Sequence, residues 1–237
     1  MRLSAPIFRL KKHARQLSRS EGIPLNQALD RVAQQEGFAQ WSLLTAQMPL
    51  TPTAAQILAQ FKPGGLVLLG GRPQQGKTTL GLSLVAEALR NGHHAAFFSL
   101  FHTQAEIDDR LLEFEINRQA MGDRVLIDTS DDISAPYISK HLANAASGTL
   151  VVIDYLQILD QRRETPDINA QVQMLKSLAT ETGVIIVTLS QVSRQFDPTE
   201  KTLPDLTDVH LPNPIDLSAF SQTCFLNEGA IRLDQAA

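Results

Sequence analysis

Eight residues from Gly71 to Thr78 have the types and the spacing of a phosphate-binding loop. The segment GRPQQGKT fits the pattern G-x-x-x-x-G-K-(S/T), in which backbone N–H groups surround a polyphosphate. The ammonium of Lys77 would lie near the β- and γ-phosphates, and the hydroxyl of Thr78 would bind Mg²⁺. The segment therefore predicts a polyphosphate and magnesium site, and its alternative is a plain glycine-rich turn.

A strand and a helix must hold this loop in place. The apolar run from Leu66 to Leu69 predicts a buried strand. After the loop, six apolar residues recur at helical spacing, namely Leu80, Leu82, Leu84, Val85, Ala88 and Leu89. The N-terminus of that helix would face the phosphates. Strand, loop and helix thus come in the order that a phosphate loop requires, which argues against the plain turn.

An acid and an amide end two later strands. Asp154 follows the apolar run VVI, at the carboxyl end of a strand, where parallel α/β sheets bind their ligands. There it would hold the Mg²⁺ that Thr78 also binds. The dipeptide Ser190-Gln191 ends the next strand, and the Gln191 amide could sense the γ-phosphate or its attacking water. An ordinary strand end is the alternative for both, but the upstream phosphate loop favours the magnesium role of Asp154.

Strands and helices alternate along residues 51 to 237. Further strands are expected at 95–100, 124–128, 149–154 and 184–189, and helices at 103–120, 134–146 and 168–182. These strands are apolar at nearly every position, which predicts an α/β fold with a mainly parallel sheet and helices on both faces. Beyond Asp197 the chain is rich in proline, and it then offers 222–226 and 230–233 as two short edge strands.

Residues 1 to 50 predict a separate, all-helical module. Three short helices are expected, one from Ser4, one from 24 to 36 and one from Phe38, held together largely by Trp41 and one Phe. The module has seven Lys/Arg and three Asp/Glu and carries +4, whereas the remainder carries −8. Its basic first helix could contact nucleic acid or a partner protein, although a solvated charged face is the commoner explanation. Residues 48–53 predict a linker, followed by a short helix.

The composition sets outer limits on the fold and on the compartment. A chain of 237 residues suffices for one α/β domain with a small appendage, here 51–237 and 1–50. Hydrophobic residues make up 43% and no apolar run approaches about 20 residues, so no membrane span is predicted. The single cysteine, Cys224, excludes an intramolecular disulfide and a cysteine-based metal site. Because no apolar signal segment follows the basic N-terminus, we expect a cytoplasmic protein.

Four segments together resemble a known family. GGRPQQGKTT, FFSL, VVIDYLQIL and LATETGVIIVTLSQVSR are similar, in order and spacing, to the RecA-like core of the DnaB-type replicative DNA helicases. IDYLQ is the most specific of them, and the resemblance covers about residues 64–226. It implies ATP contacts from nine loop residues, which are Gly71, Arg72, Pro73, Gln74, Gln75, Gly76, Lys77, Thr78 and Thr79. It also implies magnesium at Asp154, γ-phosphate sensing at Gln191, and DNA-facing loops after Asp160 and Ser193.

The sequence departs from that family in its catalytic equipment. Phe101 occupies the position from which the family's Glu polarises the attacking water. His102, Glu106 and Asp108 lie nearby, but both carboxylates should extend along the next helix, too far out for good geometry. That family supplies Lys and Arg from a longer strand pair to the neighbouring subunit's site, whereas here only Arg232 is left, so the sequence does not support an arginine finger. Such a finger typically contributes about 10³ to 10⁵ in rate, so we expect slow hydrolysis unless a partner completes the site.

The expected DNA-facing loops are poor in net charge. Their cations are Arg162, Arg163, Arg194 and Lys201, and acids offset them. The sequence therefore does not predict a strong helicase.

Two functional hypotheses remain. The favoured one is a magnesium-dependent, helicase-like ATPase that hydrolyses ATP slowly and acts with DNA or a DNA-processing partner, because Lys77, Thr78, Asp154 and Gln191 are all retained. The other is a switch or adaptor that binds ATP and hardly turns it over, for which Phe101 is the best evidence. A small-molecule kinase is third, since no arginine-rich lid can be found. The sequence leaves the oligomeric state and the choice between DNA and protein partners open.

Overall fold

The computed structural model describes residues 3–5, 7–46, 52–160 and 164–235. The chain divides into two compact units, one of Met1–Thr51 with Asn227–Ile231 and one of Pro52–Leu226 with Arg232–Ala237. The predicted boundary between residues 50 and 51, and most of the predicted linker, lie outside the described residues. Over the part of the chain that is described, no helix is both long enough and apolar enough to cross a membrane.

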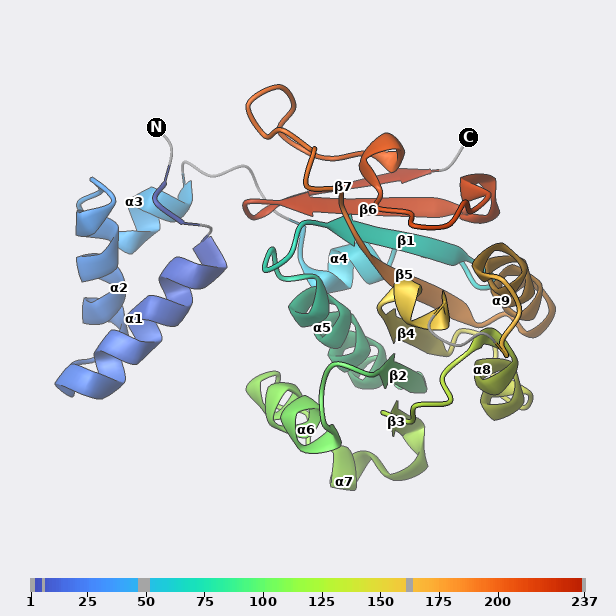
Figure 1. Cartoon of the computed structure of the whole chain (residues 1–237). Helices are drawn as coiled ribbons and strands as arrows, with labels where there is room; N and C mark the ends of the chain where they lie inside the picture. The colour runs from blue at the N-terminus through green and yellow to red at the C-terminus, as the bar shows by residue number, and fades with distance from the viewer. Residues whose placement is uncertain (1–2, 6, 47–51, 161–163, 236–237) are drawn as a thin grey trace. The chain divides into compact units, whose positions relative to one another are not determined.

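A seven-stranded sheet forms the centre of the larger unit (Figure 1). Its order is β3-β2-β4-β5-β1-β6-β7. The strands are β1 (Leu66–Gly71), β2 (Ala95–Ser99), β3 (Val125–Asp128), β4 (Leu150–Asp154), β5 (Ile185–Gln191), β6 (Gln222–Asn227) and β7 (Ala230–Gln235). All pairs from β3 to β6 are parallel. Every residue of β1, β2, β4 and β6 is buried, as expected for strands covered on both faces. The predicted α/β fold with a mainly parallel sheet is confirmed.

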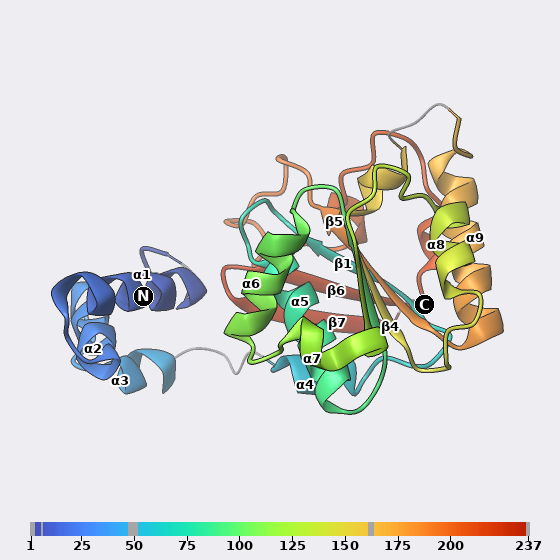
Figure 2. The same cartoon turned by 90° about the horizontal axis from the view of Figure 1, so that it is seen from below.

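Helices cover both faces of this sheet, and Figure 2 shows α5 and α6 on one side and α8 and α9 on the other. The helices of this unit are α4 (Ala54–Leu58), α5 (Lys77–Arg90), α6 (Gln104–Glu113), α7 (Arg118–Met121), α8 (Ala135–Leu142) and α9 (Ile168–Thr182). The carboxyl ends of the parallel strands consequently lie along one edge, where loops connect to the following helices.

Two predicted helices differ from those observed. The single helix at 103–120 is wrong, because α6 ends at Glu113 and Glu115 has a left-handed backbone with φ 61°. The Asn117 side chain then accepts a hydrogen bond from the Gln119 N–H and starts α7 as a separate helix. The helix at 134–146 is shorter than predicted, since α8 ends at Leu142 and the chain turns back toward β4.

The prediction of two edge strands is wrong for β6. This strand pairs in parallel with β1, from Val67 opposite Gln222 to Gly71 opposite Leu226, and all six of its residues are buried. Of these two strands, β7 alone lies at an edge of the sheet, and β3 forms the opposite edge. The turn between them consists of Glu228 and Gly229, with φ values of 50° and 88°, which is the conformation that closes a two-residue hairpin.

The helical module consists of α1 (Ile7–Glu21), α2 (Leu25–Gln35) and α3 (Trp41–Ala46). Among the side chains that the structure describes, the buried core is aliphatic and comprises Leu10, Ala14, Ala28, Val32, Ala33 and Leu44. Phe38 and Trp41 pack against this core but are only partly buried. These two rings therefore pack at the margin of the described core, and the prediction that aromatic residues largely hold the module together stays a prediction.

Candidate functional site

The phosphate loop runs from the end of β1 to the start of α5 (Figure 1). A Cβ on Gly70 would lie 2.5 Å from the Phe225 ring, and one on Gly71 would lie 2.7 Å from the Leu226 side chain. Only glycine therefore lets β1 pack against β6 here. Gly76, with φ 97°, turns the chain into α5. The first N–H groups of α5 have no partner within the helix, so they can bind an anion.

Lys77 points back into this loop. Its Nζ donates hydrogen bonds to the carbonyl oxygens of Gly71 and Arg72 at 2.8 and 3.0 Å. Burial lowers the pKa of Lys77 from 10.5 to about 8, an effect that the nearby charge of Asp154 partly opposes. A partly buried ammonium held by backbone carbonyls lacks a full counter-charge in the loop, and the oxygens of a polyphosphate would provide one.

Thr78 and Asp154 meet although 76 residues separate them in the chain. The Thr78 hydroxyl donates to the Asp154 carboxylate at 2.8 Å. Asp154 is 5% exposed at the end of β4. Burial raises the pKa of Asp154, and the Thr78 hydrogen bond acts in the opposite direction. A hydroxyl and a carboxylate are the oxygen donors that Mg²⁺ binds beside nucleotide phosphates, so this pair fits the ion.

Gln191 ends β5 directly opposite Gly71 in the parallel register. Its carbonyl accepts a hydrogen bond from the His210 N–H at 2.8 Å, and Val192 N–H donates to the Gly71 carbonyl at 3.2 Å. The end of β5 is thus bonded both to the phosphate loop and to the segment around His210. This position suits the predicted sensing role, which stays a prediction.

Sequence reasoning assigned no role to Gln157. Its Nε2 donates to the Ser190 hydroxyl at 3.3 Å and to the His210 carbonyl at 2.8 Å. The residue therefore ties the segment after β4 to the end of β5. The signal that could have identified it is its place in IDYLQ, three residues after Asp154.

Phe101 lies two residues beyond the end of β2, whose last residue, Ser99, is opposite Asp154 in the sheet. Its side chain is 51% exposed, and its ring stacks on Tyr155 with centroids 4.8 Å apart. The two carboxylates that could replace the missing glutamate, Glu106 and Asp108, bond with residues near their own helix. Glu106 accepts from the Thr103 N–H at 2.8 Å, and Asp108 pairs with Arg118 at 2.6 Å. Neither is directed to the phosphate loop by these contacts, as the sequence predicted.

Of the cations predicted for the DNA-facing loops and the arginine finger, most either lie outside the described residues or form ion pairs with acids. Arg162 and Arg163 lie outside the described residues. Lys201 Nζ pairs with Asp205 at 2.8 Å and with Asp208 at 2.6 Å. The remaining two differ, because Arg232 pairs with Asp234 at 2.7 Å whereas Arg194 is exposed.

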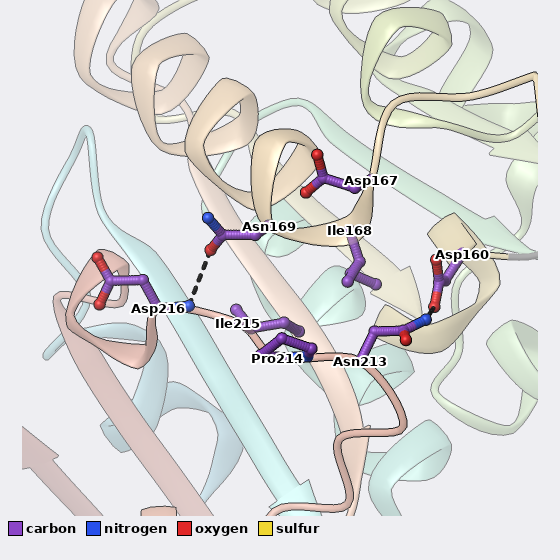
Figure 3. Close-up of a pocket in the computed structure, with 8 residues that line it drawn as sticks. All are labelled: Asp160, Asp167, Ile168, Asn169, Asn213, Pro214, Ile215 and Asp216. Carbon is purple, nitrogen blue, oxygen red and sulfur yellow. Dashed lines mark hydrogen bonds between the residues drawn. The ribbon is translucent and has the colours of Figure 1, made fainter.

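A cavity of about 520 Å³ lies elsewhere, at the start of α9 (Figure 3). Its lining consists of Asp160, Asp167, Ile168, Asn169, Asn213, Pro214, Ile215 and Asp216. The Asp216 N–H donates to Asn169 at 2.8 Å, and Asn213 donates to the Asp160 carboxylate. The described residues that line this cavity include three carboxylates and no cation, so this lining does not favour a polyphosphate. It shares no residue with the phosphate loop.

Comparisons with known proteins find similarity to DnaB-type helicases. The family model described as DnaB-like helicase C terminal domain matches residues 116–219. The replicative DNA helicase DnaB of Mycoplasma pneumoniae is 26% identical over 202 residues, covering 69% of this chain and 43% of the relative. That of Leifsonia xyli subsp. xyli is 27% identical over 203 residues, covering 73% and 44%. The chain spans less than half the length of these curated relatives.

A solved structure supports the same fold. The chain superimposes on a DnaB-like replicative helicase, whose structure was reported with its interactions with primase, with a TM-score of 0.58 and 18% identity. The match covers 91% of this chain and 64% of the other. The predicted resemblance to the RecA-like core of DnaB-type helicases is confirmed. The family match includes Asp154 and Gln191 but begins after the phosphate loop.

Proposed function

We propose that the RecA-like, DnaB-type core of this chain binds ATP with Mg²⁺ and hydrolyses it slowly. The observation that carries the proposal is the meeting of α5 and β4, where the Thr78 hydroxyl lies 2.8 Å from the Asp154 carboxylate and Lys77 lies inside the loop. A polyphosphate site and an oxygen-donor pair for a divalent cation thus adjoin each other. The similarity to helicase domains supports ATP as the nucleotide.

Each residue would have a separate task. Lys77 would exchange the Gly71 and Arg72 carbonyls for oxygens of the β- and γ-phosphates, and the N–H groups at the start of α5 would orient the same phosphates. Thr78 and Asp154 would hold Mg²⁺, which when bound neutralises charge that develops on the phosphates. Gln191 would sense the γ-phosphate from the end of β5.

Slow turnover follows from two side chains. Phe101 cannot accept a proton from the attacking water, and a general base typically contributes about 10² to 10⁴ in rate. Arg232 is paired with Asp234, and it would have to leave this pair to act as an arginine finger. Both missing contributions reduce the rate while leaving nucleotide binding intact, because neither residue forms part of the phosphate loop.

DNA or a DNA-processing protein is the proposed partner. The relatives are named replicative DNA helicases, and one solved neighbour is described with primase. These names favour the helicase-like ATPase over the switch or adaptor. The cytoplasmic location stays a prediction, and so does the extent of oligomerisation.

The test is ATP turnover at saturating Mg²⁺, with and without single-stranded DNA. We expect slow hydrolysis that requires Mg²⁺ and that DNA increases. A Lys77→Ala protein is the control, because any activity that survives in it comes from a contaminant. Tight ATP binding without turnover under all these conditions would favour the switch, and absence of ATP binding would contradict the proposal as a whole.

A further inference from the structure

Helix α1 separates its apolar and its charged residues. Leu10 and Ala14 are buried in the module core. On the exposed surface of the same helix lie four cations, Lys11, Lys12, Arg15 and Arg19. Lys11, Arg15 and Arg19 are successive i, i+4 neighbours and so form a row along the helix, about 12 Å long at 1.5 Å per residue. Lys12 lies beside this row. These four residues are called the basic face below.

The carboxylates of the module are all used elsewhere. Residues 1–50 contain three acids. Glu21 pairs with Arg31, Asp30 accepts a hydrogen bond from the Trp41 N–H at 2.9 Å, and Glu36 accepts one from the Ser4 N–H at 2.7 Å.

Within the described part of the chain, no acid pairs with any residue of the basic face. The charge of the face is therefore available to a ligand. Lys201 differs in this respect, because two aspartates already neutralise it.

The chemistry of the exposed surface favours a polyanion over a protein. Among the α1 side chains that the structure describes, the exposed ones are all charged or polar, and those between the cations include His13, Gln16 and Ser20. A protein interface needs an apolar centre. Binding to a phosphate backbone needs only cations spaced along a surface, and it carries no sequence information.

We propose that the basic face binds the phosphate backbone of DNA, irrespective of base sequence and of bound nucleotide. This goes beyond the proposed function, because it assigns DNA contact to a module that contains none of the ATP-site residues. It makes the association strongly dependent on salt, since each neutralised phosphate releases counterions.

The experiment compares two variants of the full chain that each lose three positive charges. Lys11→Gln/Arg15→Gln/Arg19→Gln removes the row, and Lys62→Gln/Lys140→Gln/Lys176→Gln removes three exposed cations from the other unit. Fluorescence anisotropy with labelled single-stranded and duplex oligonucleotides, between about 50 and 200 mM salt, gives the slope of log K against log salt. The slope is negative, and we expect the first variant to reduce its magnitude by about 2 to 3 and the second to leave it unchanged.

Further measurements make the result decisive. A charge-preserving variant, Lys11→Arg/Arg15→Lys/Arg19→Lys, should keep the slope of the parent, and circular dichroism should show the same helix content in every protein. Equal slopes in the parent and in both Gln variants, or equal losses in both, would overturn the proposal. Tighter binding of polyglutamate than of DNA to the parent would also overturn it, in favour of an acidic protein. ATP binding measured in the same proteins reports separately on the proposed function.

Discussion

The two halves of the carboxyl edge of the sheet are equipped differently. At the phosphate loop, Lys77 donates hydrogen bonds to two loop carbonyls and Thr78 donates one to Asp154, at distances of 2.8 to 3.0 Å. At the end of β2, the side chain in the place of a water-activating group is an exposed phenyl ring stacked on Tyr155. The residues predicted to bind nucleotide therefore form a hydrogen-bonded group, whereas the position predicted for water activation has no carboxylate.

Burial explains why Lys77 and Asp154 should tolerate substitution less well than Phe101. Lys77 and Asp154 are charged groups removed from water, and a buried charge is costly unless it is paired or hydrogen-bonded. Replacing either one leaves the other with poorer compensation. Phe101 is half exposed, so a change there alters the chemistry with a smaller effect on packing. Variants in the two halves should accordingly change different quantities.

The largest effect is expected at Lys77. Lys77→Ala should weaken ATP binding by about 10²- to 10⁴-fold, because two charge-assisted hydrogen bonds at about 1.5 to 3 kcal/mol each are lost. Isothermal titration calorimetry measures it, with Lys140→Ala as a control at an exposed site. Unchanged affinity in Lys77→Ala would show that the phosphate loop is not the nucleotide site.

Asp154→Asn should weaken the apparent affinity for Mg²⁺ in the presence of ATP by about 10- to 100-fold, the range seen when groups that support a metal are replaced. The amide keeps the shape of the side chain and can still accept from Thr78, so the fold should persist. A titration of ATP binding with Mg²⁺ gives the shift. If the Mg²⁺ dependence of the variant equalled that of the parent, Asp154 would have no part in holding the ion.

Phe101→Glu should increase single-turnover ATP hydrolysis about tenfold or more, equivalent to about 1.4 kcal/mol off the barrier. A carboxylate there could polarise the attacking water, whereas Phe101→Gln, the matched control, cannot accept a proton. Rapid-quench measurements at saturating ATP give the rate. A folded Phe101→Glu protein that binds ATP and hydrolyses it no faster would direct attention to the missing arginine finger.

The smallest effect is expected in the loop after Ser193. Lys201→Gln removes ion pairs with Asp205 and Asp208, but these side chains are partly exposed, so the loss of stability should be small. The midpoint of thermal unfolding should fall by no more than about 4 °C at low salt and by less at high salt. ATP binding should not change. A stability loss well above this range would mean that the ion pairs support more of the fold than one loop.

Local patterns in the sequence were sufficient for much of the fold. The apolar runs that became β1 and β4 and the periodic residues of α5 are short-range signals, because strands buried on both faces and helices with one apolar side differ in spacing. The phosphate loop was equally recognisable, since its glycines, its lysine and its threonine are adjacent in the chain. The fold class followed from the alternation of these segments.

Contacts between distant segments were decided by the tertiary structure. Short strands near a proline-rich segment suggest an edge, yet β6 is enclosed because the hairpin from Glu228 to Gly229 places β7 outside it. The hydrogen bonds of Gln157 depend on how β5 and the segment around His210 approach it.

Whether a cation is free or paired with an acid was likewise decided by the tertiary structure. By residue type Lys201 and Arg15 are alike, but the fold pairs Lys201 with two aspartates, whereas exposed Arg15 has no ion pair with any acid that the structure describes. The sequence by itself determined which groups could do chemistry, because residue types and local spacing are written in it. Only the tertiary structure decided which groups meet and which charges remain available, because pairing energies depend on distance and burial in three dimensions.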